Sequence, residues 1–168
     1  MATTKAQSSV KECPSCKREV ESDSDFCPSC GHLFLRPAEA RCRDHGTRPG
    51  VGVCVICSDP FCAECLKKVS GRFLCKDHRR VHIEQDWALA YESSDINNAK
   101  LAKAVLDEAG FDVVVRDFAP MGNIWDGAGD SSLSQTFLRK LAKVFVPIPQ
   151  YLDALKAIEE WDEGEKSV

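Results

Sequence analysis

All ten cysteines of this 168-residue chain lie between positions 13 and 75, and each belongs to a pair whose members are separated by two residues. The pairs are Cys13/Cys16, Cys27/Cys30, Cys42/His45, Cys54/Cys57, Cys62/Cys65 and Cys75/His78. Ten thiols and two imidazoles make twelve metal donors. Twelve donors divide into three tetrahedral zinc sites with no cysteine left over.

The first half of the chain has few large apolar residues, so a hydrophobic core alone cannot stabilise it. It needs disulfides or bound metal ions as cross-links. The segment from Met1 to Val10 is polar and lacks the apolar stretch of a signal peptide. No segment approaches the roughly 18 apolar residues of a membrane helix. We therefore expect a cytoplasmic protein without a membrane segment. In this reducing compartment disulfides are disfavoured, so bound metal is the expected cross-link.

The charge of the first half depends on the metal. Residues 1–85 contain 14 Lys and Arg against 11 Asp and Glu, which suggests a mildly basic segment. Counting one site of four thiolates and two sites of three thiolates and one imidazole changes its formal charge from +3 to about −1. Residues 86–168 contain 15 acidic and 8 basic side chains. Both halves therefore argue against a nucleic-acid-binding surface.

The first module, residues 11–36, repeats one short motif. Cys13-Pro14-Ser15-Cys16 is followed after ten residues by Cys27-Pro28-Ser29-Cys30-Gly31, and proline and glycine favour a tight turn around a metal. The pattern resembles a zinc ribbon, with Lys17 where a glycine often stands. A rubredoxin-like iron site or a thioredoxin-like redox pair is the alternative, but the ten-residue polar spacer does not suit the redox motif.

The second module, residues 41–82, has eight donors in 37 residues. Their order and spacing resemble the B-box-type zinc finger. Spacing alone also permits sequential pairing of the donors; the resemblance implies interleaved sites. The implied sites are Cys42, His45, Cys62 and Cys65 for one zinc, and Cys54, Cys57, Cys75 and His78 for the other.

Two details of the second module stay open at this point. His82 lies four residues after His78, so on a helix either could face the metal, and the repeated spacing favours His78. Leu66, Val69, Phe73 and Leu74 are expected to form a small core, with a turn at residues 70–72. B-boxes often follow a RING domain in ubiquitin ligases. The first module has only four donors and cannot be a two-zinc RING, so the sequence does not favour a ligase.

The third module, residues 86–161, has the pattern of an α+β domain of β-α-β-β-α order with both helices on one face. A strand at 87–91 is expected to bury Trp87, Leu89 and Tyr91 on one face. A helix follows, with an N-cap offered by Ser93-Ser94-Asp95 and an end at Gly110. The remaining predictions are strands at 111–116 and 141–146, a helix from Pro149 to Trp161, and a disordered tail at 162–168.

The third module resembles a prokaryotic family of unknown function, described as signal-transducing and compared in fold with PII-like, ferredoxin-like domains. The resemblance rests on residues 99–111 and on Val144-Phe145-Val146-Pro147. It implies signalling and brings no ligand or catalytic residue. A long loop at 119–133 departs from the compact pattern. Its residues Met121, Ile124 and Trp125 either cover the open sheet face or form a lip for a partner or a small-molecule ligand.

These patterns favour a non-enzymatic cytoplasmic protein. Four protein donors per zinc leave no coordination position for a catalytic water, and no triad, phosphate-binding loop or carboxylate pair stands apart from the metal ligands. We expect the zinc modules to bind a protein partner and the acidic third module to sense or relay a signal. The alternative is a nucleic-acid-associated regulator that uses the zinc ribbon.

Overall fold

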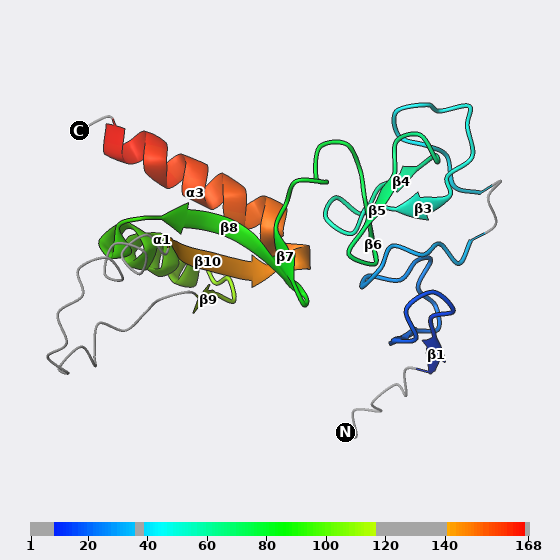
Figure 1. Ribbon diagram of the computed structural model, residues 1–168, viewed down its shortest axis with the longest axis horizontal. Coiled ribbons are helices and arrows are strands. Elements are labelled where there is room, and N and C mark those ends of the chain that lie inside the picture. The colour runs from blue at the N-terminus through cyan, green and yellow to red at the C-terminus, as the bar shows by residue number, and fades with distance from the viewer. Residues whose placement is uncertain (1–8, 36–38, 117–140, 167–168) are drawn as a thin grey trace, which may run out of the picture. The chain divides into compact units, whose positions relative to one another are not determined.

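The structure is a computed structural model that describes residues 9–35, 39–116 and 141–166. The chain divides into two compact units, Met1–Arg80 and Val81–Val168. The first unit contains both cysteine-rich modules, and the second contains an α+β region (Figure 1). The predicted lip residues Met121, Ile124 and Trp125 lie outside the described residues.

The first unit is built from short antiparallel hairpins in its described part. Each hairpin is a two-stranded sheet, so little of this unit is regular secondary structure. Cysteines occupy many of its buried positions. The strand pairs are β1 (Val10–Glu12) with β2 (Glu19–Glu21), β3 (Gly52–Val53) with β4 (Pro60–Phe61), and β5 (Lys67–Val69) with β6 (Arg72–Leu74).

The β5–β6 hairpin turns at Ser70 and Gly71, which both have positive φ angles of 48° and 82°. Such a two-residue turn matches the twist of the flanking strands. Leu66 and Leu74 are buried as predicted, but Val69 is 39% exposed. Arg72, which the sequence placed in the turn, is instead only 8% exposed and lies at the start of β6. The expected core is therefore wrong at Val69.

The second unit is a four-stranded antiparallel sheet in the order β7-β8-β10-β9. Helices α1 and α3 contact each other, and both contact β8 and β10. The helices therefore form one layer on the sheet, as expected from the β-α-β-β-α pattern, with β7 as an additional edge strand. The elements are β7 (Ile83–Glu84), β8 (Trp87–Ser93), α1 (Ile96–Glu108), β9 (Val114–Arg116), β10 (Ala142–Pro147), η1 (Ile148–Gln150) and α3 (Tyr151–Lys166).

Helix α1 begins and ends where its capping residues predict. The Asp95 side chain accepts a hydrogen bond of 2.8 Å from the backbone N–H of Asn97. Gly110, just beyond the helix, has a φ of +85°. The face of α1 that is buried carries Ala99, Ala102 and Leu106. Small residues on this face allow the helix to lie close to its neighbours.

Strand β8 does not bury Trp87, Leu89 and Tyr91 on one face. Leu89 pairs with Phe145 and Tyr91 with Val144, so the register shifts and Ala90 is the extra residue of a β-bulge. Consecutive residues of β10 point to opposite faces, and their partners do the same. Tyr91 therefore contacts Trp161 of α3, while Leu89 lies on the opposite face with Phe145.

Two further boundaries differ from the sequence prediction. The strand predicted at residues 111–116 is shorter, because only Val114–Arg116 pairs with β10. Helix α3 continues to Lys166, so residues 162–166 are helical where a disordered tail was expected. Among the described residues, no helix combines the length and apolar character that a membrane crossing requires.

Candidate metal centres

The first metal centre combines Cys13, Cys16, Cys27 and Cys30 from the two short motifs of the first module. The Sγ atoms of Cys13 and Cys30 lie 3.7 Å apart, and those of Cys16 and Cys27 lie 3.6 Å apart. A tetrahedral zinc ion with Zn–S bonds of about 2.3 Å holds its sulfurs about 3.8 Å apart. The distances fit a metal centre, and all ten cysteines are free thiols.

One backbone turn places the ligands at several of these motifs. The N–H of the residue four positions after the first cysteine donates to that cysteine's carbonyl, at 2.9 Å from Lys17 to Cys13 and 2.8 Å from Gly31 to Cys27. Both donor residues have positive φ angles, 63° for Lys17 and 80° for Gly31. Lys17 thus adopts the backbone conformation that favours glycine, as its position in the motif predicts.

The second metal centre combines Cys42, His45, Cys62 and Cys65. The Nδ1 atom of His45 lies 3.8, 3.6 and 3.3 Å from the Sγ atoms of Cys42, Cys62 and Cys65, respectively. A tetrahedral zinc ion places a nitrogen and a sulfur donor about 3.6 Å apart. The donor set therefore fits a zinc ion held by three thiolates and one imidazole.

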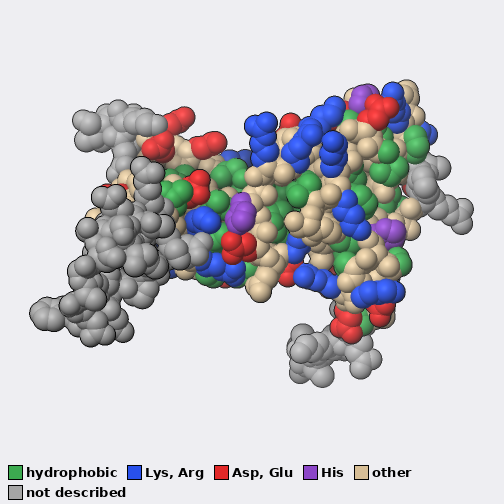
Figure 2. All heavy atoms as spheres, viewed as in Figure 1, with side chains coloured by type: hydrophobic (Ala, Val, Ile, Leu, Met, Phe, Trp, Pro, Cys, Tyr) green, Lys and Arg blue, Asp and Glu red, His purple; other side chains and the backbone are tan. Residues whose placement is uncertain are grey.

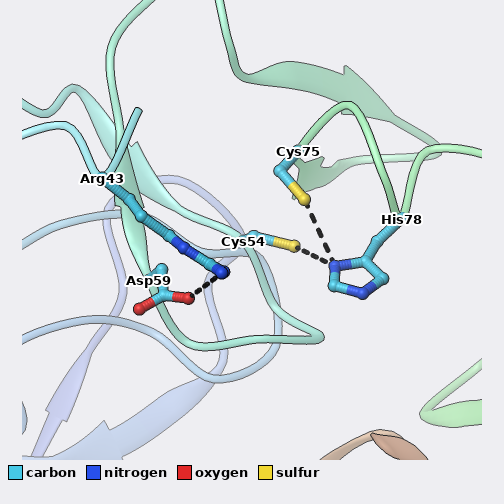
Figure 3. A network of polar contacts seen from close by, with 5 residues as sticks. All are labelled: Arg43, Cys54, Asp59, Cys75 and His78. Atoms are coloured by element: carbon cyan, nitrogen blue, oxygen red, sulfur yellow. Dashed lines mark hydrogen bonds and ion pairs between the residues drawn. The ribbon is translucent and has the colours of Figure 1, made fainter. Parts of the chain in front are cut away.

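The third metal centre combines Cys54, Cys57, Cys75 and His78. Figure 3 shows the sulfurs of Cys54 and Cys75 directed at the imidazole of His78, at 3.6 and 3.2 Å from its Nδ1 atom. Within each of the three clusters, all ligand atoms lie within 4.8 Å of one another. The three clusters are thus consistent with three zinc ions, as the donor count predicts.

The second and third centres interleave along the chain. Cys42 and His45 meet Cys62 and Cys65 across the segment that contains Cys54 and Cys57, which in turn meet the pair at 75 and 78. Spacing alone left sequential pairing open, and the structure places the donors in the interleaved arrangement. Interleaved sites close longer loops than sequential ones and so constrain the unfolded chain more strongly.

His82 belongs to none of the three clusters. Its Nε2 atom is 2.8 Å from Oε1 of Glu84, and its ring packs against Phe145 at a centroid distance of 6.0 Å. Both contacts belong to the second unit. The structure therefore brings His78, and not His82, to the third cluster.

Contacts between the thiols of the third centre shift their pKa values in opposite directions. A hydrogen bond from the Cys57 thiol lowers the pKa of Cys54 to about 4, and the same contact raises the pKa of Cys57. In the first centre, burial raises the pKa of Cys27 to about 12. A divalent cation at the centre of each cluster replaces the shared protons and favours the thiolate form of every cysteine. The chemistry of the donor set therefore fits zinc.

Comparison with known proteins brings nothing further. No family model, curated protein or solved structure matches this chain. The metal assignment thus rests on the number, spacing and geometry of the donors.

The sequence analysis missed one residue beside the metal centres. Arg72 lies on β6 with its Nη1 atom 2.7 Å from the carbonyl oxygen of Ser29, which is next to the ligand Cys30. Residues 72 and 74 share a face of the strand, and both are buried. No signal within the segment indicated this burial, because a charged side chain favours an exposed turn.

Metal analysis of the purified full chain is expected to find three zinc ions per molecule. His78→Ala is expected to reduce the value to two, because it removes a donor of the third centre. His82→Ala is the matched control and is expected to keep three. Inductively coupled plasma mass spectrometry measures the ratio, and a reproducible value of one for the unaltered chain contradicts the assignment.

Proposed function

We propose that this protein is a non-enzymatic, cytoplasmic zinc-binding adaptor. The observation that carries the proposal is that each metal cluster contains four protein donors, of which at least three are thiols. Catalytic zinc sites keep one position for water or substrate, whereas four-donor, thiolate-rich sites are structural. Ten free thiols also suit a reducing compartment. The zinc ions then shape a surface for a protein partner.

The proposal assigns the two cysteine-rich modules to known kinds of zinc finger. The four-cysteine cluster between two short motifs supports a zinc ribbon for the first module. The two interleaved clusters, each of three cysteines and one histidine, support a B-box-like finger for the second. Such small modules commonly serve protein–protein contacts, and full coordination leaves their exposed surface as the part that can act.

For the second unit we propose a role in sensing or relaying a signal. The support is the single helix layer on an antiparallel sheet, in which β8 and β9 flank β10 and α1 connects β8 to β9 in sequence. This arrangement agrees with the likeness to PII-like, ferredoxin-like domains. Fold alone does not specify a ligand. The experiment below is therefore directed at the protein partner.

Nucleic-acid association is the weaker candidate. Figure 2 shows Lys and Arg side chains on the visible face of the first unit with acidic side chains among them. Two arginines of the first unit are already paired with carboxylates: Arg43 with Asp59 at 2.8 Å and Arg48 with Glu64 at 2.5 Å. Paired surface charges attract phosphate less strongly than a continuous basic stripe does.

The adaptor proposal is tested by affinity capture with the tagged full chain, with Cys62→Ser and with Ala63→Ser. A protein that the unaltered chain and Ala63→Ser capture, and that Cys62→Ser does not, supports the adaptor proposal, because only Cys62 is a metal ligand. Nuclease treatment of the lysate has to leave the capture unchanged. Tight binding of purified chain to RNA or DNA that falls steeply between about 50 and 200 mM salt favours the alternative.

A further inference from the structure

The loop at residues 29–32 of the first module contacts both the first metal centre and the second module. The Gly31 N–H donates to the carbonyl of Cys27 at 2.8 Å, and the His32 carbonyl accepts from the Cys27 N–H at 2.8 Å. Cys27 and Cys30 are both ligands of the first metal centre. These two hydrogen bonds therefore fix the loop beside that centre.

Three carbonyl groups of the same loop, those of residues 29–31, face the second module. The Cys30 carbonyl accepts from the Phe73 N–H at 2.9 Å, and the Gly31 carbonyl accepts from the Val53 N–H at 2.9 Å. The Ser29 carbonyl accepts from the Arg72 guanidinium at 2.7 Å. Three consecutive carbonyls of a ligand-bearing loop are thus bound by β3 and β6.

The Arg72 contact is the strongest of the three by its chemistry. The donor carries a full charge, and a charge-assisted hydrogen bond is roughly twice as strong as a neutral one. Arg72 is 8% exposed, so the contact is shielded from water. The peptide group that accepts it links Ser29 to the metal ligand Cys30.

We propose that Arg72 is a positioning residue for the first metal centre, although it belongs to the second module. Its guanidinium holds the 29–30 peptide in place, and this peptide leads directly into the ligand Cys30. Groups that orient the ligands of a metal raise its affinity for the site. The inference rests on the metal centres and not on the adaptor proposal, so the two stand or fall separately.

The test follows metal binding in the full chain with Arg72→Met, Arg72→Lys and, as control, Lys67→Met. Lys67 is an exposed cation on the same hairpin. Chelator competition measures the affinity of each centre, and cadmium-113 NMR separates the four-cysteine centre from the two centres that contain a histidine. Arg72→Met is expected to lower the affinity of the four-cysteine centre by about ten- to one-hundredfold and to move its cadmium resonance.

The variants separate a positioning role from a merely structural one. Arg72→Lys keeps a cationic donor and is expected to restore part of the affinity, while Lys67→Met leaves it unchanged. The proposal is overturned if Arg72→Met leaves the four-cysteine centre as it was, or if it weakens all three centres equally. Should Arg72→Met not bind three metal ions, Arg72→Gln, which keeps a neutral N–H donor, is judged by the same two criteria.

Discussion

Replacing Cys62 with serine is expected to unfold the second cysteine-rich module while the α+β unit stays folded. Cys62 is one of four donors in the second metal centre. A structural zinc site contributes about 10–16 kcal/mol of binding free energy in zinc-finger peptides at pH 7. This amount is as large as the whole stability of a typical domain, roughly 5–15 kcal/mol. A first unit with only short hairpins has little else to hold it.

The effect is expected to extend into the first module. Val53 and Phe73 of the second module donate to the carbonyls of Gly31 and Cys30, and these acceptors lose their partners when the second module unfolds. Two-dimensional amide NMR of the full chain measures the outcome residue by residue. Signals of residues 39–80 are expected to collapse to unfolded positions, those of residues 9–35 to broaden, and those of 83–116 and 141–166 to persist.

Ala63→Ser is the control for this experiment, because Ala63 is an exposed neighbour that binds no metal. It is expected to leave the spectrum unchanged apart from local shifts. If Cys62→Ser also abolishes the dispersed signals of the second unit, the two units fold as one cooperative structure and the division at residue 80 does not describe their folding.

Replacing Gly31 with alanine is expected to be the most destabilising non-ligand change in the first module. Gly31 has a φ of +80°, a conformation that costs an L residue about 1–2 kcal/mol. A Cβ atom at this position lies 2.0 Å from the carbonyl oxygen of Val53, so the loop and β3 have to move apart. The hydrogen bonds from the Val53 N–H to the Gly31 carbonyl and from the Phe73 N–H to the Cys30 carbonyl, worth about 1 kcal/mol each, then weaken.

Gly71→Ala provides a closely matched control for Gly31→Ala. Gly71 has nearly the same φ, +82°, but an added Cβ atom there meets nothing within 4 Å. Chemical denaturation of the zinc-loaded chain is expected to show a loss of about 3 kcal/mol or more for Gly31→Ala. The loss for Gly71→Ala is expected to be about 1–2 kcal/mol. Equal losses would show that backbone strain alone accounts for both and that the close approach of Val53 does not matter.

The metal centres were largely predictable because their information is local. A Cys-x2-Cys motif contains two ligands within four consecutive residues, so the ligands can be identified from the motif itself. The positive φ of Lys17 follows from its place after the second cysteine. The partition of the donors was not local, so the interleaving of the second and third centres depended on a family resemblance. The N-cap at Asp95 and the burial of Ala99 and Ala102 were likewise encoded within one helix.

The features that the sequence analysis missed depend on pairing between distant segments. The bulge at Ala90 exists only relative to β10, and it moves Leu89 and Tyr91 to opposite faces of the sheet. The burial of Arg72 depends on an acceptor 43 residues earlier in the chain. Hydrophobic alternation within a strand reports neither kind of contact, because it describes one segment at a time.

The interleaving of the metal centres also determines when each centre can form during translation. The chain emerges from its N-terminus, so the first centre has all four donors once Cys30 is available, the second only after Cys65, and the third only after His78. While synthesis proceeds, Cys54 and Cys57 are exposed before their partners exist. The nascent chain therefore passes through a stage in which unpaired thiolates can take up zinc in the wrong combination, and this stage ends only when His78 has emerged.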